Sequence, residues 1–121
     1  MIGIGIDAVD VARMRDVMSR TPGFAQRVFT DAEIAALADR EDPSPSFAAR
    51  FAAREAVMKA LGVGLGAFDL HDVSVERTTS GEPRLVVRGR AAALAEERGI
   101  TTWFLSLTHT ESVAMAMVAA E

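Results

Sequence analysis

The spacing of apolar residues along the chain predicts a short strand at the start, followed by helices. Residues 2–6 form an apolar run with two glycines, which is typical of a buried strand. The next apolar residues recur at helical spacing: Val11, Met14, Val17 and Met18. Thr21-Pro22-Gly23 then ends this first helix. Asp7 lies between strand and helix, where it is placed to cap the helix.

Capping residues mark the starts of two further helices. Residues Thr30 to Glu33 have the form of a capping box, so a second helix is expected from there to about Asp39. Ser46 is placed to cap a third helix, which is rich in alanine and ends at Gly62. The loop between them contains two prolines and is too short to separate domains.

Short strands dominate the second half of the chain and are predicted at residues 73–76, 85–87, 102–108 and 112–119. A hairpin-like turn joins the first two, and a helix over 91–98 separates the pairs. In the last strand both alternating sets of side chains are apolar, so we expect a helix to cover one face and another subunit the other. The order of elements predicts one α+β domain over residues 1–121, with a mainly antiparallel sheet packed with helices.

Composition narrows the class of protein. The 121 residues suit one domain, and the absence of cysteine excludes disulfides, thiolate zinc sites and cysteine nucleophiles. A net charge of −4 argues against a general nucleic-acid binder. No apolar run approaches the roughly 20 residues that span a bilayer, and the first residues do not resemble a signal peptide. We therefore expect a cytoplasmic protein with no membrane partner.

Positive charge gathers early in the chain, at Arg13, Arg15, Arg20 and Arg27, ahead of an acidic stretch over residues 33–42. A local basic surface on an acidic chain attracts an acidic partner. The alternative is a solvated helix face, which charge alone favours.

Two glycine motifs invite a comparison with phosphate-binding loops. Residues Gly3 to Ala8 match the dinucleotide fingerprint, but only two residues precede the first glycine where that motif needs a full strand. The second motif, Gly62 to Gly66, leaves a helix instead of opening one. Glycine there lets a backbone approach a phosphate, although a helix cap and turn is the default interpretation.

The third helix holds the densest set of ionisable groups. Glu55 and Lys59 are four residues apart, in the orientation of a surface salt bridge, and spacing alone favours that interpretation. Their neighbours are nearly all apolar, so a carboxylate there needs a partner such as a metal ion. Together with Asp7, Glu55 would suit Mg²⁺, which takes its other ligands from phosphate and water. His109, between Thr108 and Thr110, is either solvated or a donor to phosphate.

Three motifs in register resemble the holo-[acyl-carrier-protein] synthases of the 4′-phosphopantetheinyl transferase family. They are Gly3 to Asp7, Arg50 to Gly62, and Ser106 to Thr110, and the similarity covers nearly the whole chain. The resemblance implies a 4′-phosphopantetheinyl transferase-like fold. It also implies transfer of 4′-phosphopantetheine from coenzyme A to a serine of an apo acyl carrier protein, with Mg²⁺ as cofactor and adenosine 3′,5′-bisphosphate released.

The resemblance also implies roles for individual residues. Asp7 and Glu55 would ligate Mg²⁺, and Lys59 would act beside the same phosphates. The residues implied to line the coenzyme A site are Arg50, Lys59, Gly62, Gly64, Thr108 and His109. Those implied to bind the carrier protein are Arg13, Arg20 and Arg27. A homotrimer with sites between subunits is expected.

Three residues depart from the family pattern. Arg54 stands where lysine is more frequent, Gly23 replaces a basic residue of some relatives, and Phe104 often corresponds to histidine. One alternative function is a non-catalytic module that binds coenzyme A or a carrier protein, and another is a magnesium-dependent nucleotide hydrolase. The complete set of Asp7, Glu55, Lys59 and His109 favours the transferase over a non-catalytic relative.

Overall fold

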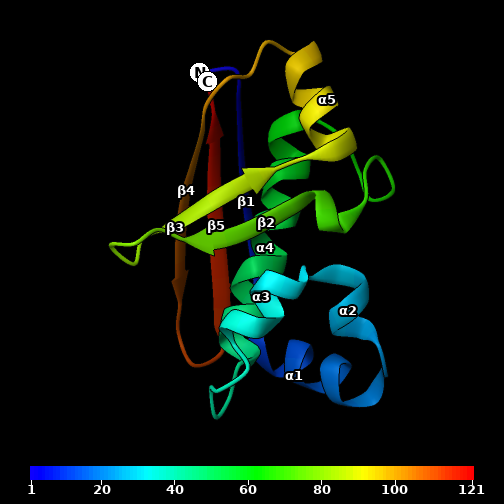
Figure 1. The fold of residues 1–121 in the computed structure, drawn as a ribbon, viewed down its shortest axis with the longest axis vertical. Coiled ribbons are helices and arrows are strands. Elements are labelled where there is room, and N and C mark those ends of the chain that lie inside the picture. Colours follow the sequence, from blue (N-terminus) through cyan, green and yellow to red (C-terminus); the bar gives the residue numbers. More distant parts are fainter.

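The computed structural model describes residues 1–121, with helices packed against strands of two separate sheets (Figure 1). The strands are β1 (Gly3–Asp10), β2 (Val73–Arg77), β3 (Pro83–Val87), β4 (Trp103–His109) and β5 (Val113–Ala120). The helices are α1 (Val11–Arg20), α2 (Phe24–Val28), α3 (Asp31–Ala36), α4 (Ser44–Leu61) and α5 (Gly89–Glu97), with a 3₁₀ turn η1 (Leu70–Asp72). No helix is both long and apolar enough to cross a membrane.

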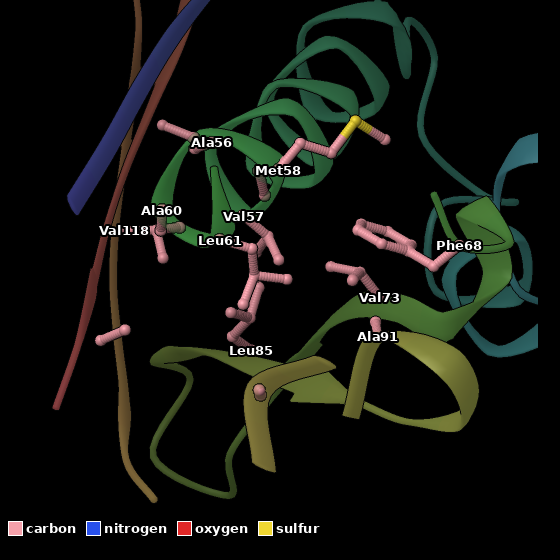
Figure 2. Packing of buried hydrophobic residues seen from close by; sticks show 14 of the residues in the cluster. Ala56, Val57, Met58, Ala60, Leu61, Phe68, Val73, Leu85, Ala91 and Val118 are labelled. Carbon is pink, nitrogen blue, oxygen red and sulfur yellow. The ribbon is translucent and has the colours of Figure 1, made fainter. Parts of the chain in front are cut away.

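All strand pairs are antiparallel, which confirms the predicted α+β class. One sheet has the order β1-β5-β4, and β2 pairs with β3 in a hairpin that crosses it in Figure 1. Helix α4 runs along the three-stranded sheet and also contacts β2 of the hairpin, while β3 lies next to β4. Figure 2 shows side chains of α4 such as Leu61 and Val57 pointing toward Val73 and Leu85 of the hairpin. The long central helix is therefore the element around which both sheets are organised.

The glycines of β1 allow the strand to lie directly against the backbone of α4. A Cβ atom added at Gly3 would collide with the carbonyl oxygen of Ala60, and one added at Gly5 with the carbonyl oxygen of Ala56. Side chains at odd-numbered positions of β1 face α4. Asp7, two residues after Gly5, therefore faces the same helix. The close packing of β1 on α4 therefore accounts for the two glycines, and no bound dinucleotide is needed to explain them.

A buried ion pair joins α3 to α4. Arg54 contacts Glu33 at 2.5 Å and 3.1 Å, and both side chains are fully buried. Arg54 also donates to the Leu70 carbonyl at 2.9 Å, and the Val75 N–H donates to Glu33 at 3.0 Å. Burial works to raise the pKa of Glu33, but the bonds and charge of Arg54 outweigh it, so that pKa is lowered. Arg54, which stands where the family more often has lysine, is thus part of a buried network.

The first strand is longer than predicted, which changes the role of Asp7. β1 pairs with β5 as far as Asp10, and Asp10 is the residue that caps α1, accepting from Ala12 N–H at 3.0 Å. The prediction that Asp7 caps the helix is wrong. Pairing with β5, over 100 residues away in sequence, keeps the chain extended past Asp7.

Other helix boundaries also differ from the prediction. Helix α4 starts at Ser44, with Pro43 at the cap position and Asp42 accepting from the Ser44 N–H, so Ser46 is not the cap. The capping box at Thr30 and Glu33 is confirmed, but α3 ends at Ala36. Helix α2 was not predicted, because five residues are too few to display a helical period.

One face of the three-stranded sheet stays open in the single chain. On β5, Ala114, Ala116, Val118 and Ala120 are buried, which confirms that a helix covers that face. The opposite face carries exposed apolar side chains, namely Ile4, Ile6, Phe104, Met115 and Met117. We call this set the open apolar face.

Candidate active site

Strand β1 and helix α4 bring three of the predicted site residues together. Lys59 Nζ donates to the Asp7 Oδ1 atom at 3.2 Å and to the Ile6 carbonyl at 2.8 Å. Asp7 and Glu55 line one cleft of about 500 Å³, which we call the carboxylate cleft. The predicted surface salt bridge between Glu55 and Lys59 is wrong: the close packing of β1 on α4 puts Asp7 within reach of Lys59 instead.

The two carboxylates of this cleft influence each other. Burial raises the pKa of Glu55 first, and the negative charge of Asp7 raises it further, against the opposing effect of Lys59. The Asp7 side chain is 19% exposed, so both acids are partly withdrawn from water. A cation between them would relieve this repulsion.

The donor set of the carboxylate cleft fits magnesium. The ligands available there are carboxylate oxygens, which suit a hard cation, and no group of three or more His, Asp or Glu residues is placed to hold a metal. A metal bound here would have two carboxylates from this chain and would take other oxygens from substrate and water. Mg²⁺ is typically held in that way by proteins.

The remaining walls of the carboxylate cleft are largely apolar and come from α1, α2, α4 and the end of β1, where Asp10 adds a third acid. They include Met14, Val17, Phe24 and Phe51, with the charged side chain of Arg13 also lining the cleft. The cleft therefore combines acidic groups with an apolar, cationic wall, and it is suited to a ligand that is polar at one end and apolar at the other.

A second cleft contains the other predicted side chains. Arg50, Thr108 and His109 line a space of about 210 Å³ together with Arg40 and Arg77, and we call it the basic cleft. Arg40, Arg50 and Arg77 also line an adjoining cleft of about 290 Å³. Arg40, in a loop, and Arg77, in β2, belong to no sequence motif. They reach Arg50 only because the fold brings these two segments to it.

The electrostatics of the basic cleft favour an anion. Arg50 is 3% exposed, and its Nε atom is buried without a hydrogen-bond partner. Burial lowers the pKa of Arg50; Glu33 opposes this, while Arg77 and Arg40 lower it further. A phosphate placed among these groups would accept hydrogen bonds and offset their mutual repulsion.

The glycine-rich segment lies at the C-terminal end of α4. Gly62 has φ of 70° and caps the helix, with its N–H donating to the Lys59 carbonyl, which confirms the cap interpretation. The Arg98 guanidinium lies beside it. A Cβ at Gly64 would meet no atom within 4 Å, so that position is open. The implied approach of phosphate to Gly62 and Gly64 stays a prediction.

One chain does not bring all the predicted coenzyme A residues to one place. Arg50 and Glu55 are five positions apart on α4, which separates them by roughly 140° around the helix axis. Across the sheet, β5 lies between Asp7 on β1 and His109 on β4. The carboxylate cleft and the basic cleft share no lining residue. The predicted site is thus divided between two sides of α4.

The arginines predicted to bind a carrier lie on α1 and α2. Arg13 lines the carboxylate cleft, Arg20 contacts Asp16 at 3.4 Å in an exposed pair, and the Arg27 guanidinium lies against Gly23. Arg15 is different, because it bonds to Asp42 at 2.7 Å and, by that hydrogen bond, lowers the pKa of the carboxyl group. A cationic surface therefore borders the carboxylate cleft.

Comparisons with known proteins agree over the full chain. Residues 3–118 match the family described as the 4′-phosphopantetheinyl transferase superfamily. A Frankia alni protein named holo-[acyl-carrier-protein] synthase is 50% identical over 121 residues, which is 100% of this chain and 98% of that protein. The crystal structure of the Neisseria meningitidis synthase has a TM-score of 0.87 at 33% identity, covering 100% of this chain and 99% of that one. The Helicobacter pylori synthase in complex with coenzyme A has a TM-score of 0.84 at 28% identity, covering 98% and 99%.

Proposed function

The chain belongs to the 4′-phosphopantetheinyl transferase superfamily as a holo-[acyl-carrier-protein] synthase, and from this premise we propose how its own residues carry out the transfer. The acceptor is a serine of an apo acyl carrier protein, and the second product is adenosine 3′,5′-bisphosphate. The observation that carries the proposal is the contact of Asp7 on β1 with Lys59 on α4, beside Glu55.

Asp7 and Glu55 would hold Mg²⁺. Their oxygen donors and their mutual repulsion, relieved by a cation, support this assignment. When bound there, magnesium would supply positive charge that stabilises the departing phosphate.

In the transfer step, the serine Oγ forms a bond to the β-phosphorus of coenzyme A. The bond from that phosphorus to the oxygen bridging the two phosphates breaks, and the electron pair leaves with adenosine 3′,5′-bisphosphate. The Lys59 ammonium lies beside the leaving oxygen and stabilises or protonates it. The serine proton passes to a water beside the Glu55 carboxylate, which lines the same cleft.

The basic cleft would receive the remaining phosphate of coenzyme A. Arg50, Thr108 and His109 were implied for this ligand, and the geometry adds Arg40 and Arg77. Gly62 and Gly64, at the end of α4, would let coenzyme A pass close to the backbone. The relative from Helicobacter pylori binds coenzyme A, which supports this ligand for the present chain.

A complete site would need two copies of the chain. The carboxylate cleft and the basic cleft lie on different sides of α4, so a coenzyme A that contacts both would bridge one copy to the next. Contact between two different surfaces is heterologous, and three copies make the smallest ring that closes in that way. The open apolar face supplies a surface that a homotrimer would bury.

The carrier protein would approach over α1 and α2. Arg13, Arg20 and Arg27 provide positive charge for an acidic carrier, and Arg13 also lines the carboxylate cleft where the serine must arrive. The apolar wall that includes Phe24 and Phe51 would contact the apolar part of the carrier surface.

Intact-protein mass spectrometry tests the proposed function. An apo carrier is mixed with the protein, coenzyme A and Mg²⁺, beside an EDTA control and a carrier whose acceptor serine is replaced by alanine. We expect the mass of one phosphopantetheine arm to appear only with metal and only on the carrier with serine. Coenzyme A breakdown without carrier would indicate a hydrolase instead. Binding without any mass gain on several carriers would indicate a non-catalytic module.

A further inference from the structure

His71 joins two elements that are distant in sequence, and neither of its ring contacts belongs to the site described above. Its Nε2 atom lies 2.7 Å from the carbonyl oxygen of Gln26 on α2. Its Nδ1 atom lies 3.0 Å from Asp69 Oδ1 in its own turn. Through this side chain the η1 turn is tied to α2.

Both ring nitrogens of His71 face atoms that only accept hydrogen bonds. A backbone carbonyl and a carboxylate have no proton to donate, and a neutral imidazole carries a single N–H. The imidazolium donates from both nitrogens, so it is the one form that satisfies both contacts. A neutral ring leaves one of these two acceptors without a proton.

The contact to Gln26 replaces a hydrogen bond that α2 lacks. In a longer helix the Gln26 carbonyl would accept from the Thr30 N–H, but that N–H donates to Glu33 Oε1 at 2.9 Å. Helix α2 has five residues, and so short a helix is held by tertiary contacts and not by its own propensity. A positive charge at its C-terminal carbonyls is also favourable.

The other charged groups near this contact are already engaged or lie elsewhere. Asp69 is the one acid in contact with the ring, while Asp72 accepts from the N–H groups of Arg90 and Ala91 at the start of α5. On α2 the one charged residue is Arg27, whose guanidinium lies against Gly23. The state of the ring is thus coupled mainly to Asp69 and to the position of α2.

We propose that the His71 imidazolium is a positioning residue that holds α2, and with it Phe24 and Arg27, in place for the carrier protein. This inference rests on the proposed function, because Phe24 lines the carboxylate cleft and Arg27 is assigned to the carrier. A neutral ring donates either to Gln26 or to Asp69 but not to both, so loss of the proton weakens the hold on α2. Carrier binding then weakens, while the residues that hold coenzyme A are not affected.

Steady-state kinetics separate this role from a general loss of structure. KM for carrier and KM for coenzyme A are measured from about pH 6 to about pH 9 in the wild type, His71→Gln and His71→Arg. We expect KM for carrier to rise about tenfold with pH in the wild type, the size of one charge-assisted hydrogen bond. His71→Gln should have the raised value at every pH with kcat little changed, whereas the permanently charged His71→Arg should keep the low value. A wild-type pH profile in His71→Gln would overturn the proposal.

Nuclear magnetic resonance tests the same contact without any substrate. The chain has two histidines, so comparison with His71→Gln assigns the ring signals directly. We expect ¹⁵N shifts of a doubly protonated ring near pH 6, and amide shifts of α2 that change with pH together with the ring. A neutral ring at that pH, or α2 amides that ignore its titration, would overturn the proposal. If no carrier is modified at all, the proposed function fails, and this measurement still decides the role of His71.

Discussion

Replacing Gly5 with alanine should damage the active site through packing alone. An added Cβ would collide with the Ala56 carbonyl oxygen and would lie 2.8 Å from its carbon and 3.0 Å from the Ala60 nitrogen. These are backbone atoms of a buried helix, so β1 has to move away by about 1 Å to reach ordinary contact distances. Such overpacking costs about 1–3 kcal/mol in the free energy of unfolding.

The same displacement would reach the proposed catalytic groups. Asp7 is two residues from Gly5 on the same face of β1, so it would move away from Glu55 and Lys59. A shift of about 1 Å in a positioned catalytic group typically lowers the rate about 10²-fold. We expect Gly5→Ala to lose about that much in kcat and to lower the melting temperature by about 4–12 °C.

Gly3→Ala provides the matched control. Its Cβ would collide with the Ala60 carbonyl in the same way, but four residues from Asp7. The melting temperature should fall by a similar amount while kcat falls much less. Thermal unfolding is followed by circular dichroism, and phosphopantetheine transfer is measured below both transitions. Wild-type stability and rate in Gly5→Ala would refute the close-packing argument.

Four further predictions concern charged groups. Glu33→Gln leaves Arg54 buried without its partner and should cost about 3–5 kcal/mol in urea unfolding. Because the pKa of Glu33 is lowered below 4.5, its contribution should be complete above that pH and be lost as pH falls through the folded-state pKa. Glu55→Gln should lower metal-dependent kcat at least about 10²-fold yet raise the melting temperature of the metal-free protein at neutral pH, since a raised pKa means that ionised Glu55 destabilises the fold. Arg13→Glu should raise KM for carrier more than KM for coenzyme A. Mixing and reassembling inactive Arg50→Ala and Glu55→Gln chains should restore about a quarter of the activity, because one random interface in four pairs two intact clefts.

Each of these has a result that would count against it. An unchanged free energy of unfolding in Glu33→Gln would show that the buried pair does not stabilise the fold. Near wild-type turnover in Glu55→Gln would refute the metal assignment, and equal changes in both KM values for Arg13→Glu would refute the carrier surface. Mixed chains that stay inactive after confirmed subunit exchange would place the whole site within one chain.

Much of the local structure follows from local sequence signals. The capping box at Thr30 and Glu33, the helix stop at Gly62 and the hairpin turn between β2 and β3 are all confirmed. These features depend on hydrogen bonds between residues a few positions apart, so a short segment contains the information needed. The boundaries that were wrong depend on partners far away. β1 extends to Asp10 because β5 pairs with it, and no local signal reports that pairing.

The sequence by itself determined the α+β class and the family, and it predicted Asp7, Glu55 and Lys59 as candidates for the chemistry. Only the tertiary structure decided which of them meet. Lys59 contacts Asp7, and not Glu55 as its spacing from Glu55 had suggested. Arg54 is buried against Glu33. Arg40 and Arg77 gather around Arg50, and the predicted site is divided between two sides of α4. The physical reason is that spacing along the chain sets which side chains share a helix face or a strand face. The distance between two elements is set by how closely their backbones pack, and here that depends on the missing side chains of Gly3 and Gly5.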